Sequence, residues 1–304
     1  MAQICFPNPF KQKGYWFKGN IHAHTTNSDG ALDARQISVL YESEGYDFLF
    51  ITDHGKPTDV QALSDSFGEE FLVLPGIELD IGKSEAGTEY HLVGLDIDHP
   101  VDAENPQAAI DEVVDEGGQI VVAHPYWSSL TVNDLMKLEG YLGVEIFNTT
   151  CHFSVAKGYS TTHWDDLLVR DKFTFGFAVD DAHYHYSSHR PVDAFYSWIM
   201  VRAEDLTKGS LMGSLWHGLF YSSNGPEILD VDVSEGSVRV LSSPAAAISF
   251  ITKNGEGERF TAMNKSIIVA EYKLRGNERY LRIEVEDKKG RTAWTNPISF
   301  IGSA

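Results

Sequence analysis

The segment 21–30, IHAHTTNSDG, has the residue types and the spacing of a metal site. His22 and His24 are two apart in a short run that is typical of a strand, so their side chains share one face. Asp29 follows in a turn that Gly30 closes, where a short carboxylate can fold back toward the same place. We therefore expect these side chains to reach one cation. The alternative is a pair of histidines on a solvated strand face.

Six further apolar runs carry a histidine or an acidic residue at one end. Buried strands of a parallel sheet read as continuous apolar runs, and barrel enzymes keep their catalytic groups at the C-terminal ends of such strands. Singly, each polar residue could be a core or capping side chain. Together they predict a polynuclear metal site at one end of a barrel. The residues are Asp53, His54, Glu78, His91, His124, Glu145, Asn148, Asp181 and His183.

The donor chemistry is consistent with such a site. Mixed sets of imidazole and carboxylate suit zinc, iron or manganese. The chain has two cysteines, Cys5 and Cys151, and neither belongs to the motifs, so we expect no thiolate near the site and no closed cysteine-type zinc site. Two cysteines in 304 residues do not form a disulfide framework and favour a reducing compartment.

These motifs resemble those of the PHP family of metal-dependent phosphoesterases, within the wider amidohydrolase-like barrels. The family pattern HxH…SDG, TDH, Glu after a strand, His, HP and DxH appears here, in order, as HAH…SDG, TDH, GIE, YH, AHP and DAH, over residues 15–222. Two details depart from it: Thr25 stands where serine is commoner, and AVDDAH replaces the usual GSDAH. Because side chains alternate along a strand, Asp181 and not Asp180 shares a face with His183.

The resemblance implies two to three divalent metal ions (manganese, zinc or iron) in a trinuclear site. The implied ligand sets are His22, His24, Glu78 and Asp181 for the first ion, Glu78, His91 and His124 for the second, and Asp29, His54 and His183 for the third. Glu78 would bridge the first two ions. The implied activity is hydrolysis of a small phosphate ester, monoester or diester, by a metal-bound hydroxide near Glu78.

Five other residues are expected to contact the substrate. Arg190, just past the last ligand, is the first choice to bind the phosphate, and Lys56 is the second. The alternative for both is a solvated surface charge. Asn148 could orient the substrate at the barrel mouth. Tyr126 and Trp127 could stack on a ring of the substrate, although such aromatic side chains more often pack.

The elements that position these residues follow from apolar periodicity. Helical patterns over residues 32–46, 105–117 and from 161 alternate with the apolar runs, which predicts βα units around a parallel sheet. The resemblance narrows this α/β prediction to a distorted (β/α)7 TIM-like barrel, residues 1–222. From residue 223 to 304, period-two alternation between glycine turns predicts a small all-β domain of the sandwich type.

Composition limits the partners. The net charge of −20, from 24 basic and 44 acidic residues, disfavours binding of long nucleic acid. The N-terminus has no apolar signal segment and no run is long enough to span a membrane, so we expect a cytoplasmic protein. The partner expected from the resemblance is a small phosphorylated molecule. Two other functions stay open: hydrolysis of a carbamate or carboxyl ester, and a non-catalytic, metal-stabilised binding module.

Overall fold

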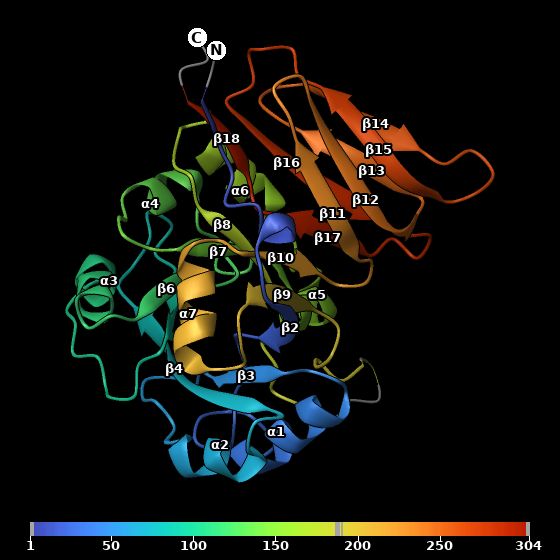
Figure 1. The fold of residues 1–304 in the computed structure, drawn as a ribbon. Coiled ribbons are helices and arrows are strands. Elements are labelled where there is room, and N and C mark those ends of the chain that lie inside the picture. Colours follow the sequence, from blue (N-terminus) through green and yellow to red (C-terminus); the bar gives the residue numbers. More distant parts are fainter. Residues whose placement is uncertain (1–2, 186–188, 190, 302–304) are drawn as a thin grey trace.

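The computed structural model describes residues 3–185, 189 and 191–301. It consists of a barrel with helices on its outside and a β-sandwich packed against it (Figure 1). The barrel strands are β2 (Tyr15–Asn20), β3 (Phe48–Ile51), β4 (Leu72–Ile81), β5 (Tyr90–Leu95), β6 (Gln119–Val122), β7 (Gly143–Asn148) and β8 (Phe175–Val179). They neighbour one another in this order, and most of their apolar side chains are buried.

The barrel closes between its first and last strands. Ala23 and Ala182, just past the ends of β2 and β8, form a parallel bridge, and the His24 amide donates to the Ala182 carbonyl at 2.9 Å. The predicted distorted (β/α)7 barrel is therefore confirmed. One detail differs from a uniformly parallel sheet: β5 is antiparallel to both β4 and β6, because residues 82–89 form a short connection with no crossover helix.

Seven α-helices lie among the described residues, and local capping explains where several begin. Asp33 and Gln36 form a capping box at α1, and Asn105 caps α3 with Pro106 in its first turn. The predicted helices over residues 32–46, 105–117 and from 161 are confirmed, each slightly shorter than its pattern. The helices are α1 (Ala34–Ser43), α2 (Gln61–Phe67), α3 (Pro106–Asp115), α4 (Val132–Met136), α5 (Thr149–Val155), α6 (Thr161–Leu168) and α7 (Lys208–Trp216). A 3-10 turn, η1 (Pro9–Lys11), precedes β2.

The C-terminal strands form two antiparallel layers. One layer is β11 (Ile228–Val233), β12 (Ser237–Ala245) and β15 (Ile267–Lys273); the other contains β13 (Ala247–Ile251), β14 (Gly257–Thr261), β16 (Tyr280–Glu286), β17 (Thr292–Thr295) and β18 (Ile298–Ile301). Buried side chains of both layers, such as Val240 and Ile283, share one apolar cluster. This is the predicted sandwich.

Strand pairings continue from the sandwich into the barrel. β9 (Trp198–Ala203) pairs with β2, β10 (Phe220–Ser223) pairs with β9, and β17 pairs with β10. The N-terminal strand β1 (Gln3–Cys5) pairs with β18. The boundary at residues 222 and 223 stays a prediction, and these pairings show that both sides of it are joined through one hydrogen-bonded sheet.

An ion pair between a buried arginine and a partly exposed aspartate also joins the two parts. Arg282 of β16 donates to both carboxylate oxygens of Asp165 on α6, at 2.7 and 2.6 Å, and its guanidinium lies 5.0 Å from the ring centre of Trp164. The Arg282 side chain is 2% exposed. Tyr280 and Trp294 of the sandwich belong to the barrel's own apolar cluster. Of the helices that the structure describes, none is long and apolar enough to cross a membrane.

Candidate metal centre

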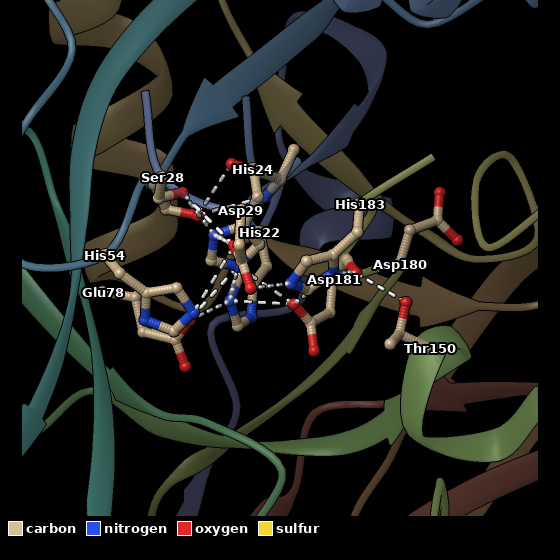
Figure 2. Close-up of polar contacts among 12 residues, drawn as sticks. His22, His24, Ser28, Asp29, His54, Glu78, Thr150, Asp180, Asp181 and His183 are labelled. Atoms are coloured by element: carbon tan, nitrogen blue, oxygen red, sulfur yellow. Dashed lines mark hydrogen bonds and ion pairs between the residues drawn. The ribbon is translucent and has the colours of Figure 1, made fainter. Parts of the chain in front are cut away.

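The barrel brings all nine predicted ligands to one end, where the parallel strands terminate. His22 and His24 follow β2, His54 follows β3, and Asp181 and His183 follow β8. Figure 2 shows these side chains converging, together with Asp29 and Glu78. His91 stands at the start of its strand and still reaches this end, because β5 runs opposite to its neighbours.

The first predicted group is a compact set of four donor atoms. His22 Nε2 lies 3.1 Å from Glu78 Oε2, 3.1 Å from His24 Nε2 and 3.2 Å from Asp181 Oδ1. His24 Nε2 lies 3.1 Å from both of these oxygens. A point at the centre of four atoms so spaced lies about 2 Å from each, which is the length of a zinc–nitrogen or zinc–oxygen bond. The donor set therefore fits a divalent ion.

The second group shares Glu78 through its other oxygen. Glu78 Oε1 lies 3.0 Å from His91 Nδ1 and 3.3 Å from His124 Nε2. In the third group, Asp29 Oδ2 lies 3.3 Å from His183 Nε2, and Asp29 Oδ1 lies 3.8 Å from His54 Nε2. His24 also lies within reach of this group. Each of the three predicted ligand sets thus comes together, and Glu78 has one oxygen in each of the first two.

Neighbouring acceptors fix several of the imidazole rings. His22 Nδ1 donates to Glu145 Oε1 at 2.6 Å, and His183 Nδ1 donates to the Asp181 carbonyl at 2.8 Å. His124 Nδ1 lies 3.0 Å from the Ser128 hydroxyl. A proton held on Nδ1 leaves the Nε2 lone pair directed into the cluster, which is the arrangement of metal-binding histidines.

The imidazole and carboxylate groups of the cluster shift one another's pKa values. Burial opposes ionisation of His22, but Asp181, Glu145 and Glu78 together raise its pKa well above the ordinary histidine value. Burial likewise opposes the charge of Glu78, yet His22 and the other imidazoles hold the pKa of Glu78 well below its usual range. The contact with His183 lowers the pKa of Asp29 to about 2. The acidic groups are therefore ionised at neutral pH and suited to a cation.

Two acidic residues that directly precede ligands face away from the cluster and position it. Asp53 accepts hydrogen bonds from the Thr25 amide at 2.7 Å, the Ser28 hydroxyl at 2.6 Å and the Thr58 hydroxyl at 2.5 Å, so it holds the loop that carries Asp29. Asp180 points away from the ligands in Figure 2.

Asp180 anchors the segment after β8 through several donors. It accepts from the Tyr41 hydroxyl at 2.8 Å, the Thr149 hydroxyl at 2.8 Å and the Phe195 amide at 2.7 Å. Burial raises the pKa of Asp180 to about 6, against these hydrogen bonds. Strand alternation predicted that Asp181 and not Asp180 would face His183, and the structure has this arrangement.

A cavity of about 280 Å³ opens over the ligands. Trp127, which is 41% exposed, forms part of its wall and lies edge-on to His91 and His124, with ring centres 5.6 and 5.0 Å apart. Cys151 also lines the cavity, and its sulfur lies within 4.8 Å of donor atoms of His124 and Asp181. The sequence did not indicate a cysteine side chain at this place, which follows because α5 starts directly after β7 at the same barrel end. Burial raises the pKa of the Cys151 thiol, so the expectation that no thiolate lies near the site is not contradicted.

The other predicted substrate contacts that the structure describes are not among the residues that line the cavity. Asn148 is fully buried, with its amide nitrogen 2.9 Å from Glu145 and 3.1 Å from Asp181, and its oxygen accepts from the Cys151 amide. This geometry gives Asn148 a positioning role and no contact with the cavity.

Tyr126 is 43% exposed and has the Lys157 ammonium 5.3 Å from its ring centre. Lys56 is exposed and is not among the described residues that line the cavity. Arg190 lies outside the residues that the structure describes.

Sequence reasoning passed over Asp80 and set Glu145 aside as a ligand. Glu145 accepts from His22, from the His124 amide at 2.8 Å and from Asn148, all beneath the cluster. Asp80 lies between His54 and His91. The signal for Asp80 is its position two residues after Glu78, which puts both on the same face of β4.

No protein-family model matches the chain, but individual proteins are similar to it. Over 80 residues it is 32% identical to the DNA polymerase/3'-5' exonuclease PolX of Bacillus subtilis, a match that covers 21% of this chain and only 14% of that protein. Its fold is similar to the crystal structure of a two-domain protein from Bacteroides vulgatus that contains a predicted PHP-like metal-dependent phosphoesterase. That likeness has a TM-score of 0.53 and 14% identity, and it covers 90% of this chain and 91% of the other. The chain therefore has the two-domain fold of a PHP-like protein, as its motifs indicated.

Proposed function

We propose that the protein is a metal-dependent hydrolase that cleaves a small phosphate ester, monoester or diester. The observation that carries this proposal is the convergence of nine histidine and acidic side chains beneath one cavity at the C-terminal end of the barrel. The fold likeness to a PHP-like protein supports it. Two to three ions of manganese, zinc or iron would be held by the three groups described above. Bound there, the ions would activate a water molecule and neutralise phosphoryl charge.

The residues of the chain would supply positioning around those ions. Glu78 offers one carboxylate oxygen to each of two groups, which is the geometry of a bridging ligand. Glu145 and the Asp181 carbonyl hold His22 and His183 in the tautomers that direct Nε2 inward. Trp127 forms an apolar wall beside the second group, where an uncharged part of a substrate can lie.

The cavity favours a small substrate. Its volume of about 280 Å³ lies just below the usual range for small-molecule sites. The net charge of −20 disfavours long polyanions, so we keep a small phosphorylated molecule as the proposed partner, without nucleic acid or membrane.

One observation favours a second candidate, the hydrolysis of a carbamate or carboxyl ester. Among the described residues that line the cavity there is no lysine or arginine. A phosphomonoester dianion would then depend on the metal ions for all of its neutralising charge, whereas an uncharged acyl substrate needs less. Arg190 is the residue whose removal separates the two candidates, because a phosphate-binding arginine matters little for an uncharged ester.

The test is a panel of nitrophenyl phosphate, bis-nitrophenyl phosphate, nitrophenyl acetate and a nitrophenyl carbamate, assayed with manganese, zinc or iron. We expect turnover of a phosphate ester that chelator abolishes and added metal restores. We expect Arg190→Ala to reduce phosphate turnover far more than acyl turnover, with Lys157→Ala, outside the cavity lining, as the matched control. Turnover confined to acyl esters would replace the proposed function with the second candidate, and no turnover by the metal-loaded protein would contradict both.

A further inference from the structure

Asp80 is an acidic side chain that touches ligands of two different groups. It lies on β4 two residues after Glu78, on the same face, and its strand position is opposite His91. Its Oδ1 lies 2.8 Å from His91 Nδ1, and its Oδ2 lies 3.1 Å from His54 Nδ1. Each carboxylate oxygen therefore meets one ring.

The two rings belong to different metal positions. His91 is grouped with Glu78 and His124, whereas His54 is grouped with His24, Asp29 and His183, and a further candidate group joins His54 to Glu78 and to Asp80 itself. Glu78 also contacts both rings, at 3.0 Å from His91 Nδ1 and 3.4 Å from His54 Nε2. The side chain of Asp80 is 39% exposed, so it contacts the two rings from the solvent side. Glu78 is buried and contacts them from the inner side.

We propose that Asp80 is a positioning carboxylate that couples the second and third metal positions by holding His91 and His54 together. This inference rests on the proposed function, because it assumes that the groups bind metal. Asp80 contacts His54 at Nδ1, opposite the Nε2 that faces Glu78, whereas it contacts His91 at Nδ1, the same nitrogen that faces Glu78. A carboxylate beside a metal-binding ring holds the direction of the ring, and its charge makes the ring a better donor. One carboxylate that does so for two rings links the affinities of the two ions, so losing it weakens both.

Substitutions at Asp80 separate its two contacts. Asp80→Ala removes both contacts. Asp80→Asn keeps one acceptor oxygen and presents an NH₂ group to the other ring, so it retains one contact. Asp98→Asn is the matched control, since Asp98 also lies beside a histidine, His99 at 3.2 Å, but is 84% exposed and is not part of any candidate metal group among the described residues.

The experiment titrates the metal-free wild type and the three variants with manganese and measures the number of ions bound and the dissociation constant of each. Thermal unfolding of the metal-free proteins is measured in parallel. We expect Asp80→Ala to weaken binding of two ions by roughly 10- to 100-fold each and to leave the ion of the His22 group at wild-type affinity. Asp80→Asn should weaken binding less, and Asp98→Asn should match the wild type.

The outcomes distinguish this inference from the proposed function. If the wild type binds manganese and Asp80→Ala binds every ion equally well, the coupling role is wrong and the proposed function stands. An equal loss from all positions, or a metal-free variant that unfolds at a lower temperature than Asp98→Asn does, would assign Asp80 a general structural role and overturn the inference. A wild type that binds no ion would contradict the proposed function as well.

Discussion

Glu145→Gln is the substitution whose effect the structure defines most closely. Glu145 accepts three N–H groups: His22 Nδ1 at 2.6 Å on one oxygen, and the His124 amide at 2.8 Å and Asn148 Nδ2 at 2.9 Å on the other. Glutamine has a single acceptor oxygen. If that oxygen accepts the hydrogen bonds from the His124 amide and from Asn148, the new NH₂ group faces His22 Nδ1.

Two donors cannot share a hydrogen bond, so His22 would move its proton to Nε2. That proton would point at Glu78 Oε2 and Asp181 Oδ1, into the centre of the first group. A ligand in this tautomer has no lone pair for a cation until the contact with residue 145 is broken. We therefore expect the affinity for the first ion to fall by roughly 10- to 100-fold, about 1.4 to 2.8 kcal/mol.

The assay is a calorimetric metal titration of the wild type, Glu145→Gln and Glu139→Gln. Glu139 is the matched control because its side chain is 78% exposed. Wild-type affinity for every ion in Glu145→Gln would refute the tautomer argument, since the substitution changes the hydrogen bonding of His22 and preserves the volume of the side chain.

Four further outcomes are expected. Glu78→Gln should abolish turnover and weaken the binding of two ions, because Glu78 has an oxygen in both groups; elemental analysis and the substrate panel measure this, and full activity would refute the bridge. Asp165→Ala should lower the free energy of unfolding by about 1.5 to 3 kcal/mol in urea, because it removes two charge-assisted hydrogen bonds of the buried Arg282, which keeps its ion pair with Glu284; a loss like that of an exposed pair, under about 1 kcal/mol, would contradict the interface account. Asp53→Asn should weaken the ion held by Asp29 more than the others, as judged by the same metal titration, because Asp53 anchors that loop. Chelation should lower the unfolding temperature measured by circular dichroism, because ions that bind only the folded state stabilise it; an unchanged temperature would mean that no ion was bound.

The ligands were predictable because their signals are local. His22 and His24 share a strand face by their spacing, and His54, Glu78 and His124 each follow or end an apolar run. The C-terminal ends of parallel strands meet at one end of a barrel, so a run of such strands already predicts that these residues converge. The resemblance adds the assignment of each residue to one ion.

The surrounding contacts were harder to predict because they depend on three-dimensional register. Cys151 reaches the cavity only because α5 begins immediately after β7. Asn148 is turned inward by Glu145 and Asp181, although its place at a strand end also suits substrate binding. The antiparallel direction of β5, which brings Asp80 opposite His91, depends on the short connection after β4 and has no strong sequence signal.

The most direct test of the account is the metal-to-protein ratio of the purified protein, measured by elemental analysis before and after chelation. The account predicts two to three equivalents of manganese, zinc or iron that chelator removes and that return on adding metal. Protein that folds, yet neither retains nor takes up divalent metal, would contradict the claim that these nine side chains form a metal centre.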